Sequence, residues 1–130
     1  MVIDTSALVA ILLGESGAKT IAKAITRDNK RLISAFSLLE TCIVIEARKG
    51  EAGGRELDIL LHHIQAEIIS MNSEQAETAR KAWRDYGKGR HAAALNIGDC
   101  CSYALAKISG EPLLFKGDDF NKTDIPVISY

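Results

Sequence analysis

Residues 1–15 read MVIDTSALVAILLGE, and the unusual residue in this stretch is Asp4. It stands directly after Val2-Ile3 and shortly before the longest apolar run of the chain, residues 7–13. An ionised carboxylate beside a hydrophobic core destabilises the fold unless another group pairs with it. The position of Asp4 therefore indicates that distant parts of the chain bring a compensating partner near it.

Length and composition are those of an ordinary globular protein. With 130 residues, 47% of them hydrophobic and 25% charged, we expect one domain over residues 1–130 with a substantial core. The net charge of −1 excludes a basic field over the whole surface, so a nucleic-acid partner would need a local cationic patch or bound metal cations. The three cysteines form neither a disulfide framework nor a zinc-binding spacing.

The N-terminal stretch lacks the features of a secretion signal. Its first basic residue is Lys19, whereas a signal peptide begins with a basic segment. The apolar run of residues 7–13 is also much shorter than the roughly 20 residues of a membrane span. We therefore expect a cytoplasmic protein with no membrane partner.

Short apolar segments alternate with helical periodicities along the chain. Strands are expected at residues 2–3, 32–33, 67–71, 112–115 and, at a sheet edge because of its proline, 126–128. Helices are expected over residues 5–13, 18–25, 37–49, 57–64, 76–86 and 99–109. This alternation favours a parallel sheet with helices on both faces, an α/β/α sandwich.

Local signals refine these helices. Thr5 or Ser6 is expected to cap the first helix, and Gly50 to end the third. The fifth helix has a stripe at helical spacing that predicts a buried face and places its tryptophan and its tyrosine in the core; the stripe comprises Ala76, Ala79, Trp83 and Tyr86. Adjacent residues of a helix point to different sides, so His62-His63 is expected at a surface or an interface.

Acidic residues from distant parts of the chain fall at one edge of the predicted sheet. Asp4 follows the first strand, and Asp118-Asp119 follows the strand that ends at Phe115. Glu40 lies in the first turn of the helix after the second strand, and Asp99 begins the helix that precedes residue 112. Sites in such sheets form outside the carboxyl ends of the strands, so these acids can converge.

Each acid also has a purely structural interpretation. Ser37-x-x-Glu40 matches a capping box, and Asp99 suits the first turn of a helix. Asp118-Asp119 suits an exposed turn, and Asp4 suits a helix cap. Apolar residues stand three, four and seven positions after Glu40, which predicts that its side of the helix is apolar and argues against a solvated cap.

Converging carboxylates raise one another's pKa or require a cation between them. No lysine or arginine is adjacent in sequence to Asp4, Glu40 or Asp99. Mg²⁺ binds one or two carboxylates and keeps waters that substrate phosphate can replace. A site for Mg²⁺ would therefore explain the position of Asp4.

The acids lie in four segments that follow one another between residue 1 and about residue 125: MVIDTSALVAILLGE, SLLETCIVIEARKG, YGKGRHAAALNIGDCCSYALAK and PLLFKGDDFNKTDI. Together these segments resemble a PIN-domain ribonuclease, and more narrowly the VapC-type toxins of type II toxin–antitoxin pairs. The resemblance implies a PIN-like three-layer α/β/α sandwich with a mostly parallel sheet of about five strands. Ala92 departs from it, since relatives often carry proline there, which bears on loop rigidity alone.

The resemblance also implies a set of site residues. The metal-binding and catalytic acids would be Asp4, Glu40, Asp99 and Asp118, with Asp119 competing for the last position. Thr5 or Ser6 would supply a hydroxyl near the first acid. The implied activity is endoribonuclease cleavage with Mg²⁺ or Mn²⁺, in which a metal-activated water attacks the phosphodiester.

Substrate contacts and partners complete this hypothesis. Residues 84–91 read RDYGKGRH, where Lys88 and Arg90 are candidates for contact with RNA phosphates, as is Lys116; a solvated loop is the alternative. The resemblance implies an RNA substrate, a homodimer and a small cognate antitoxin whose C-terminal segment covers the acidic groove. The rival hypothesis is a non-catalytic module with a PIN fold that binds RNA or an antitoxin.

Overall fold

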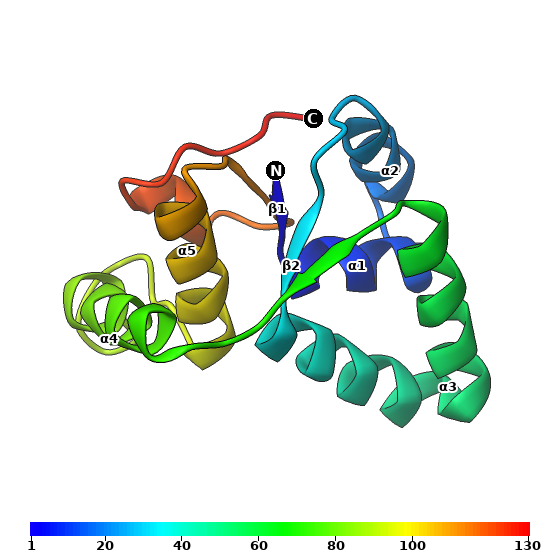
Figure 1. The fold of residues 1–130 in the computed structure, drawn as a ribbon, viewed down its shortest axis with the longest axis horizontal. Helices are drawn as coiled ribbons and strands as arrows, with labels where there is room; N and C mark the ends of the chain where they lie inside the picture. Colours follow the sequence, from blue (N-terminus) through cyan, green and yellow to red (C-terminus); the bar gives the residue numbers. More distant parts are fainter.

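The computed structural model describes residues 1–130, in which one or two helices separate each strand from the next (Figure 1). The elements are β1 (Val2–Ile3), α1 (Thr5–Leu12), α2 (Ala18–Thr26), β2 (Leu32–Ser34), α3 (Ala35–His63), β3 (Glu67–Ile69), α4 (Ser73–Tyr86), α5 (Ile97–Ser109), β4 (Leu113–Leu114) and the 3-10 helix η1 (Asp119–Lys122). The strands form one parallel sheet in the order β3-β2-β1-β4. The predicted α/β architecture is confirmed.

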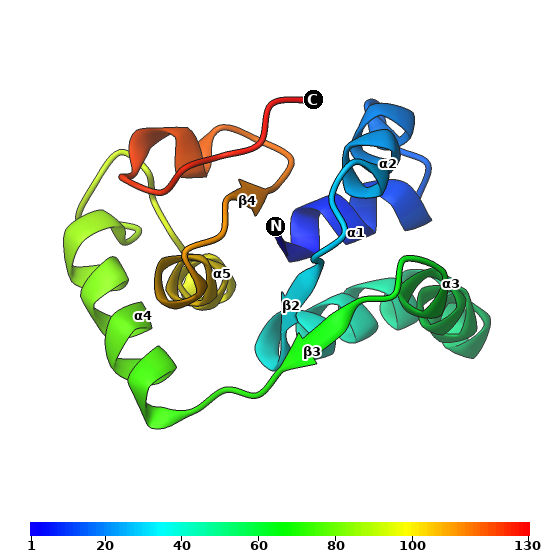
Figure 2. The same ribbon diagram turned by 45° about the horizontal axis from the view of Figure 1, so that its top comes forward.

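Each face of the sheet has its own core. The strand dipeptides Val2-Ile3, Leu32-Ile33 and Leu113-Leu114 send their first residue into the core shared with α4 and α5. Their second residue packs into the core shared with α1 and α2. Successive strand residues point to opposite faces, so a sheet covered on both sides needs apolar residues at consecutive positions. Figure 2 shows α5 on one side of the strands and α1 and α2 on the other.

The sheet has four strands where about five were expected. Residues 126–128 lie beside β4, as the edge prediction required, but they form a single parallel bridge between Val127 and Leu113. The Leu113 amide donates to the Pro126 carbonyl, and the Ile128 amide donates to the Leu113 carbonyl. Pro126 has no amide hydrogen to add to the ladder, which is consistent with a bridge too short to count as a strand.

The expected capping residues of two helices are wrong, although α1 starts at residue 5 as predicted. Asp4, and not Thr5 or Ser6, caps α1, because its carboxylate accepts a hydrogen bond from the Ser6 amide. Helix α3 begins at Ala35 with Ser34 as its N-cap, so Ser37 and Glu40 do not form a capping box. The Ser34 hydroxyl accepts from the Phe36 amide and starts the helix directly at the end of β2.

The expected end of the third helix is a sharp kink. Gly50 has φ 64° and ψ −163°, which is not helical, and a second helical segment follows directly and runs to His63. Glycine adopts this backbone conformation without the steric penalty of a side chain. The residues predicted as a separate fourth helix therefore lie in the second half of α3, where His62 and His63 are exposed as expected.

The buried face of α4 differs from the predicted stripe by a rotation of about one residue. The buried positions are Gln75, Ala79 and Ala82. Trp83 is 45% exposed, so its expected place in the core is wrong, whereas Tyr86 packs against the core as predicted. Across the whole fold, no helix has both the length and the apolar character needed to cross a membrane.

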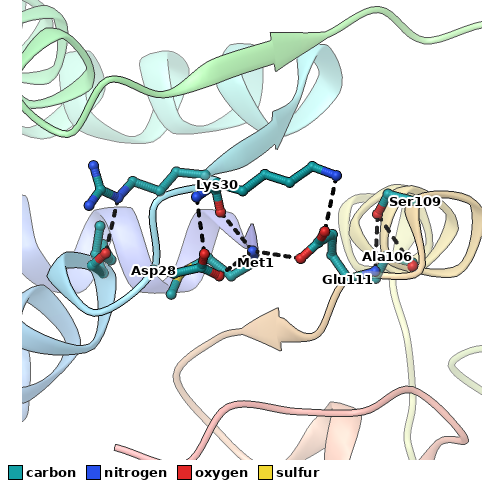
Figure 3. A network of polar contacts seen from close by, with 8 residues as sticks. Met1, Asp28, Lys30, Ala106, Ser109 and Glu111 are labelled. Carbon is teal, nitrogen blue, oxygen red and sulfur yellow. Dashed lines mark hydrogen bonds and ion pairs between the residues drawn. The ribbon is translucent and has the colours of Figure 1, made fainter.

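A charge-balanced cluster ties the amino end of β1 to its neighbours (Figure 3). The Met1 amino group donates to Asp28 Oδ2 and to the Lys30 carbonyl, both at 2.7 Å, and to Glu111 Oε2 at 3.1 Å. The Lys30 ammonium lies 3.0 Å from the other oxygen of Glu111. These contacts hold the turns that precede β2 and β4 against β1.

Candidate active site

Asp4 lies at the carboxyl end of β1 and is 3% exposed. Its Oδ2 accepts hydrogen bonds from the Ser6 amide at 3.0 Å and from the Ser6 hydroxyl at 2.7 Å. Its Oδ1 accepts from the Ser102 hydroxyl at 2.5 Å. Two hydroxyls and one amide therefore satisfy this buried carboxylate, as a buried charge requires.

Ser102 belongs to a buried hydroxyl chain that sequence reasoning did not find. Its hydroxyl lies 3.2 Å from that of Ser37, and both side chains are fully buried. The Ser37 carbonyl in turn accepts from the hydroxyls of Thr5 and Thr41. The available signal was a serine among the apolar residues of the CCSYALA segment, where a polar side chain needs a partner.

Glu40 reaches the first turn of α5 from α3. A Cβ built on Gly98 would lie 2.5 Å from Glu40 Oε1 and 2.6 Å from Oε2. Glycine at position 98 therefore makes room for this carboxylate. The predicted apolar stripe around Glu40 is wrong in detail, since Ile43 is 60% exposed and the buried positions of α3 fall on a different face.

Asp99 both caps the start of α5 and lies in the acidic cluster, the two roles that the sequence left open. It forms a capping box with Asn96, in which the Asp99 amide donates to Asn96 Oδ1 and the Asn96 amide donates to Asp99 Oδ2. Burial raises the pKa of Asp99 to about 6, and the charges of Asp4, Asp119 and Glu40 add to the increase. The capping geometry therefore leaves Asp99 inside a cluster of like charges.

One cavity of about 430 Å³ brings Asp4, Glu40 and Asp99 together. Lys116 and Glu15 also line it, and their side chains form an ion pair at 2.7 Å. The Lys116 charge is thus matched by Glu15, an acid that sequence reasoning did not single out. No group of three His, Cys, Asp or Glu side chains is placed so that it could hold a metal ion without rearrangement.

Thr5 and Ser6 also line this cavity, whereas the remaining charged candidates do not. Asp118 and Asp119 are both exposed at the start of η1, and the negative charge of Asp119 contributes to the raised pKa of Asp99. Lys88 is exposed and lines a neighbouring apolar groove. Arg90 lies with its guanidinium carbon 4.6 Å from the Trp83 ring centroid. The structure therefore separates the loop cations from the acidic cavity.

Comparison with known proteins identifies the fold and the family. The family model described as PIN domain matches residues 1–126. The chain belongs to the PIN-domain family. This PIN domain is 57% identical to ribonuclease VapC30 of Mycobacterium tuberculosis, over 99% of the chain and 98% of that protein. It is therefore a VapC-type PIN domain, and the resemblance inferred from the four sequence segments is confirmed.

Solved structures share the fold of this PIN domain. The structure of Mycobacterium tuberculosis VapC20, described as a sarcin–ricin-loop-cleaving toxin, matches with a TM-score of 0.80 at 16% identity, over 98% of this chain and 97% of that one. A toxin–antitoxin complex from Klebsiella pneumoniae matches with a TM-score of 0.74 at 20% identity, over 99% and 97% of the two chains. At these identities the likeness establishes the fold alone.

Proposed function

We propose that this VapC-type PIN domain is a divalent-metal-dependent endoribonuclease and the toxin of a toxin–antitoxin pair. The observation that carries the proposal is the convergence of Asp4, Glu40 and Asp99 on one cavity at the carboxyl end of the sheet. Burial and neighbouring carboxylates raise the pKa of Asp99 to about 6, which marks a cluster that a cation would stabilise.

The donor set suits Mg²⁺ or Mn²⁺, which bind carboxylate oxygens. Glu40 accepts no hydrogen bond, and Asp99 uses Oδ2 in its capping box and keeps Oδ1 available. Asp4 accepts three hydrogen bonds, and a carboxylate offers about four lone-pair sites, so one remains. Since Mg²⁺ needs only one or two carboxylates with waters, these three acids fit the cation although they form no complete cage.

Asp119 is the fourth acid that we propose, in preference to Asp118. Its charge contributes to the raised pKa of Asp99, and both residues sit in the exposed turn that begins η1. Asp118 is the N-cap of η1. A rotation of this exposed turn would change which carboxylate faces the cavity, so the two positions are best tested together.

In the proposed mechanism, Asp4, Glu40 and Asp99 would hold a divalent cation, which would supply polarisation of the scissile phosphate and a water of lowered pKa. Glu40, with both carboxylate oxygens free of hydrogen bonds, orients the attacking water or accepts its proton. Ser6 and Ser102 hold Asp4 in one orientation. Lys116 can contact RNA phosphate when it leaves Glu15, and the exposed Lys88 and Arg90 supply further phosphate contacts.

Structured or looped RNA is the substrate class that we propose. The fold neighbour VapC20 is described as cleaving the sarcin–ricin loop, and VapC30 is named a ribonuclease. Side chains read RNA sequence mainly in single-stranded loops and ends, where bases are accessible. An RNA loop presented to the acidic cavity would meet this requirement.

We also propose a homodimer and a cognate antitoxin as partners. The outer face of α3 exposes Leu39 and Ile43, and Ile97 is exposed at the start of α5. Exposed large apolar side chains, of which Leu39 and Ile43 lie one helical turn apart, are typical of protein interfaces. The Klebsiella pneumoniae fold neighbour is described as a toxin–antitoxin complex, which supports an antitoxin as partner. The proposed antitoxin would cover the acidic cavity with its C-terminal segment.

The cleavage test compares the wild-type protein with Asp4→Asn and Asp99→Asn on the same RNA with Mg²⁺. We expect cleavage by the wild type and none by Asp4→Asn or Asp99→Asn, because each of these two variants removes a charge that the cation needs. We also expect no cleavage in EDTA, which removes the cation. Asp85→Asn, which changes an exposed aspartate of α4, serves as the control and should cleave normally. Equal cleavage by every variant would indicate a contaminant, and RNA binding without cleavage would favour the non-catalytic module.

A further inference from the structure

An apolar groove of about 520 Å³ adjoins the acidic cavity. It lies where α4 packs against α5, and Phe36 of α3 and Ile97 of α5 are among the residues that line it. Asn96 lines both the groove and the cavity, so the two share a wall (α4 and α5 are seen side by side in Figure 1). A ligand bound at the acids can therefore extend into the groove.

Trp83 is the main aromatic side chain of this groove and the only tryptophan of the chain. Trp83 is 45% exposed, whereas the much smaller Ala79 and Ala82 of the same helix, α4, are buried. A Cβ at Gly87 would lie 2.5 Å from Trp83 Cδ1, so glycine at this position makes room for the indole. The indole therefore lies against the backbone at Gly87 while the residue stays 45% exposed to solvent.

Unmatched positive charge surrounds the indole. The Arg90 guanidinium carbon lies 4.6 Å from the Trp83 ring centroid, and Arg90 Nε donates to the Arg84 carbonyl. Lys88 also lines the groove, and neither Lys88 nor Arg90 forms an ion pair with an acid. An apolar floor with free cations suits a ligand that joins a flat apolar ring to negative charge.

We propose that this groove binds an unpaired base of the RNA substrate, stacked on Trp83, with its flanking phosphates on Lys88 and Arg90. This inference rests on the proposed function, since it places the base next to the cavity of Asp4 and Asp99, where the phosphodiester would be cleaved. A base enters such a groove only when it is out of a duplex stack. The groove thus selects single-stranded or looped RNA and sets where the chain is cut.

Binding is measured in EDTA, so that no cleavage interferes, with a single-stranded RNA of about twelve alternating A and C residues, within the usual footprint of such proteins. Because Trp83 is the only tryptophan, intrinsic fluorescence reports on this groove. We expect saturable quenching by the single strand. A duplex of equal length should bind at least about tenfold more weakly, because its bases are already stacked.

Variants separate stacking from general charge attraction. By anisotropy of labelled RNA, Trp83→Ala should weaken binding roughly 5- to 150-fold, the range for loss of one base–aromatic stack, and Trp83→Phe should recover part of it. Tyr130→Ala changes an aromatic residue with the same 45% exposure outside the groove and should leave affinity unchanged. Arg90→Ala should weaken binding more than Arg55→Ala, which removes an exposed arginine of α3.

The outcomes distinguish this inference from the proposed function. Unchanged affinity in both Trp83 variants overturns the groove as a base site, whatever the result of the cleavage test. Trp83-dependent binding by a protein that fails to cleave with Mg²⁺ upholds the groove and refutes the nuclease. Trp83 fluorescence that changes with protein concentration, or with an antitoxin peptide and not with RNA, assigns the groove to a protein partner and overturns the proposal.

Discussion

The two ends of β1 carry opposite arrangements of charge only a few residues apart. At the amino end, the Met1 amino group contacts Asp28 and Glu111, and positive and negative groups alternate (Figure 3). At the carboxyl end, Asp4 and Asp99 share a cavity with another acid and without a free cation. The same strand therefore ends in a balanced cluster on one side and an unbalanced cluster on the other.

The pKa values follow this difference. The hydrogen bond from the Met1 amino group lowers the pKa of Asp28, and the bond from Lys30 is the main cause that lowers the pKa of Glu111. Burial raises the pKa of Asp99 to about 6 instead. The balanced cluster stabilises the fold, whereas the unbalanced cluster lowers its stability, as is typical of functional sites; the proposed cation would relieve this cost.

The largest effect is expected from Ser102→Ala, which removes the donor to Asp4 Oδ1 without touching the cavity surface. Loss of a group that orients a metal ligand typically lowers metal affinity or activity about 10- to 100-fold. Mn²⁺ affinity, measured by electron paramagnetic resonance, should fall by this amount, and RNA cleavage should fall with it. Ser109→Ala, at the other end of α5, is the control. Unchanged Mn²⁺ affinity would reduce Ser102 to a packing residue.

A second, smaller effect is expected from Gly98→Ala, whose new Cβ would displace the Glu40 carboxylate. A misplacement of about 1 Å can lower a rate by up to 100-fold, and because a flexible side chain can adjust we expect about tenfold slower cleavage. Gly54→Ala, in the second half of α3, is a matched control, since its Cβ would displace the Glu46 carboxylate. Equal cleavage rates for Gly98→Ala and Gly54→Ala would show that the position of the Glu40 carboxylate does not affect the reaction.

Asp28→Asn should weaken the balanced cluster alone. The amide still accepts a hydrogen bond from the Met1 amino group but carries no charge, so we expect a loss of about 1 kcal/mol in the free energy of unfolding. Urea denaturation measures this change, and Asp58→Asn on the exposed side of α3 provides the reference. RNA cleavage at saturating Mg²⁺ should stay at the wild-type rate, and slower cleavage would show that the two ends of β1 are coupled.

The smallest effect is a pH dependence of opposite sign at the two ends. The pKa of Asp99 is raised from 3.8 to about 6, so the folded protein keeps a proton that the unfolded chain releases, and stability falls as pH rises between these values. In EDTA, Asp99→Asn should therefore be more stable than the wild type above pH 6, by about 1 kcal/mol after allowance for partial exposure, and similar near pH 4.

Asp28 provides the contrast in the same titration. Its pKa is lowered, so its contribution to stability is present above the ordinary value of 3.8 and is lost as pH falls further. The difference between Asp28→Asn and the wild type should thus persist at pH 5, where that of Asp99→Asn is already shrinking. A difference for Asp99→Asn that does not vary with pH would mean that its carboxylate is not destabilised by burial.

Some features of the site and fold could not be predicted, because they depend on rotations and contacts that leave no local pattern. The predicted buried face of α4 contained Trp83, whereas the observed buried face contains Ala82, one residue earlier. Both faces have apolar residues at helical spacing, so the sequence pattern did not distinguish them. Ser102 lies 98 positions from the carboxylate it holds. Lys116 is paired by Glu15, which is 101 positions away.

The sequence by itself determined the α/β architecture, the PIN-type order of segments and the placement of acids after strands, since each depends on residues only a few positions apart. The tertiary structure alone decided how charge is distributed. It brought Asp4, Glu40 and Asp99 into one cavity and paired the Lys116 ammonium with the Glu15 carboxylate. The physical reason is that a pKa or an ion pair depends on distance and burial in space, and the packing of the whole fold sets both.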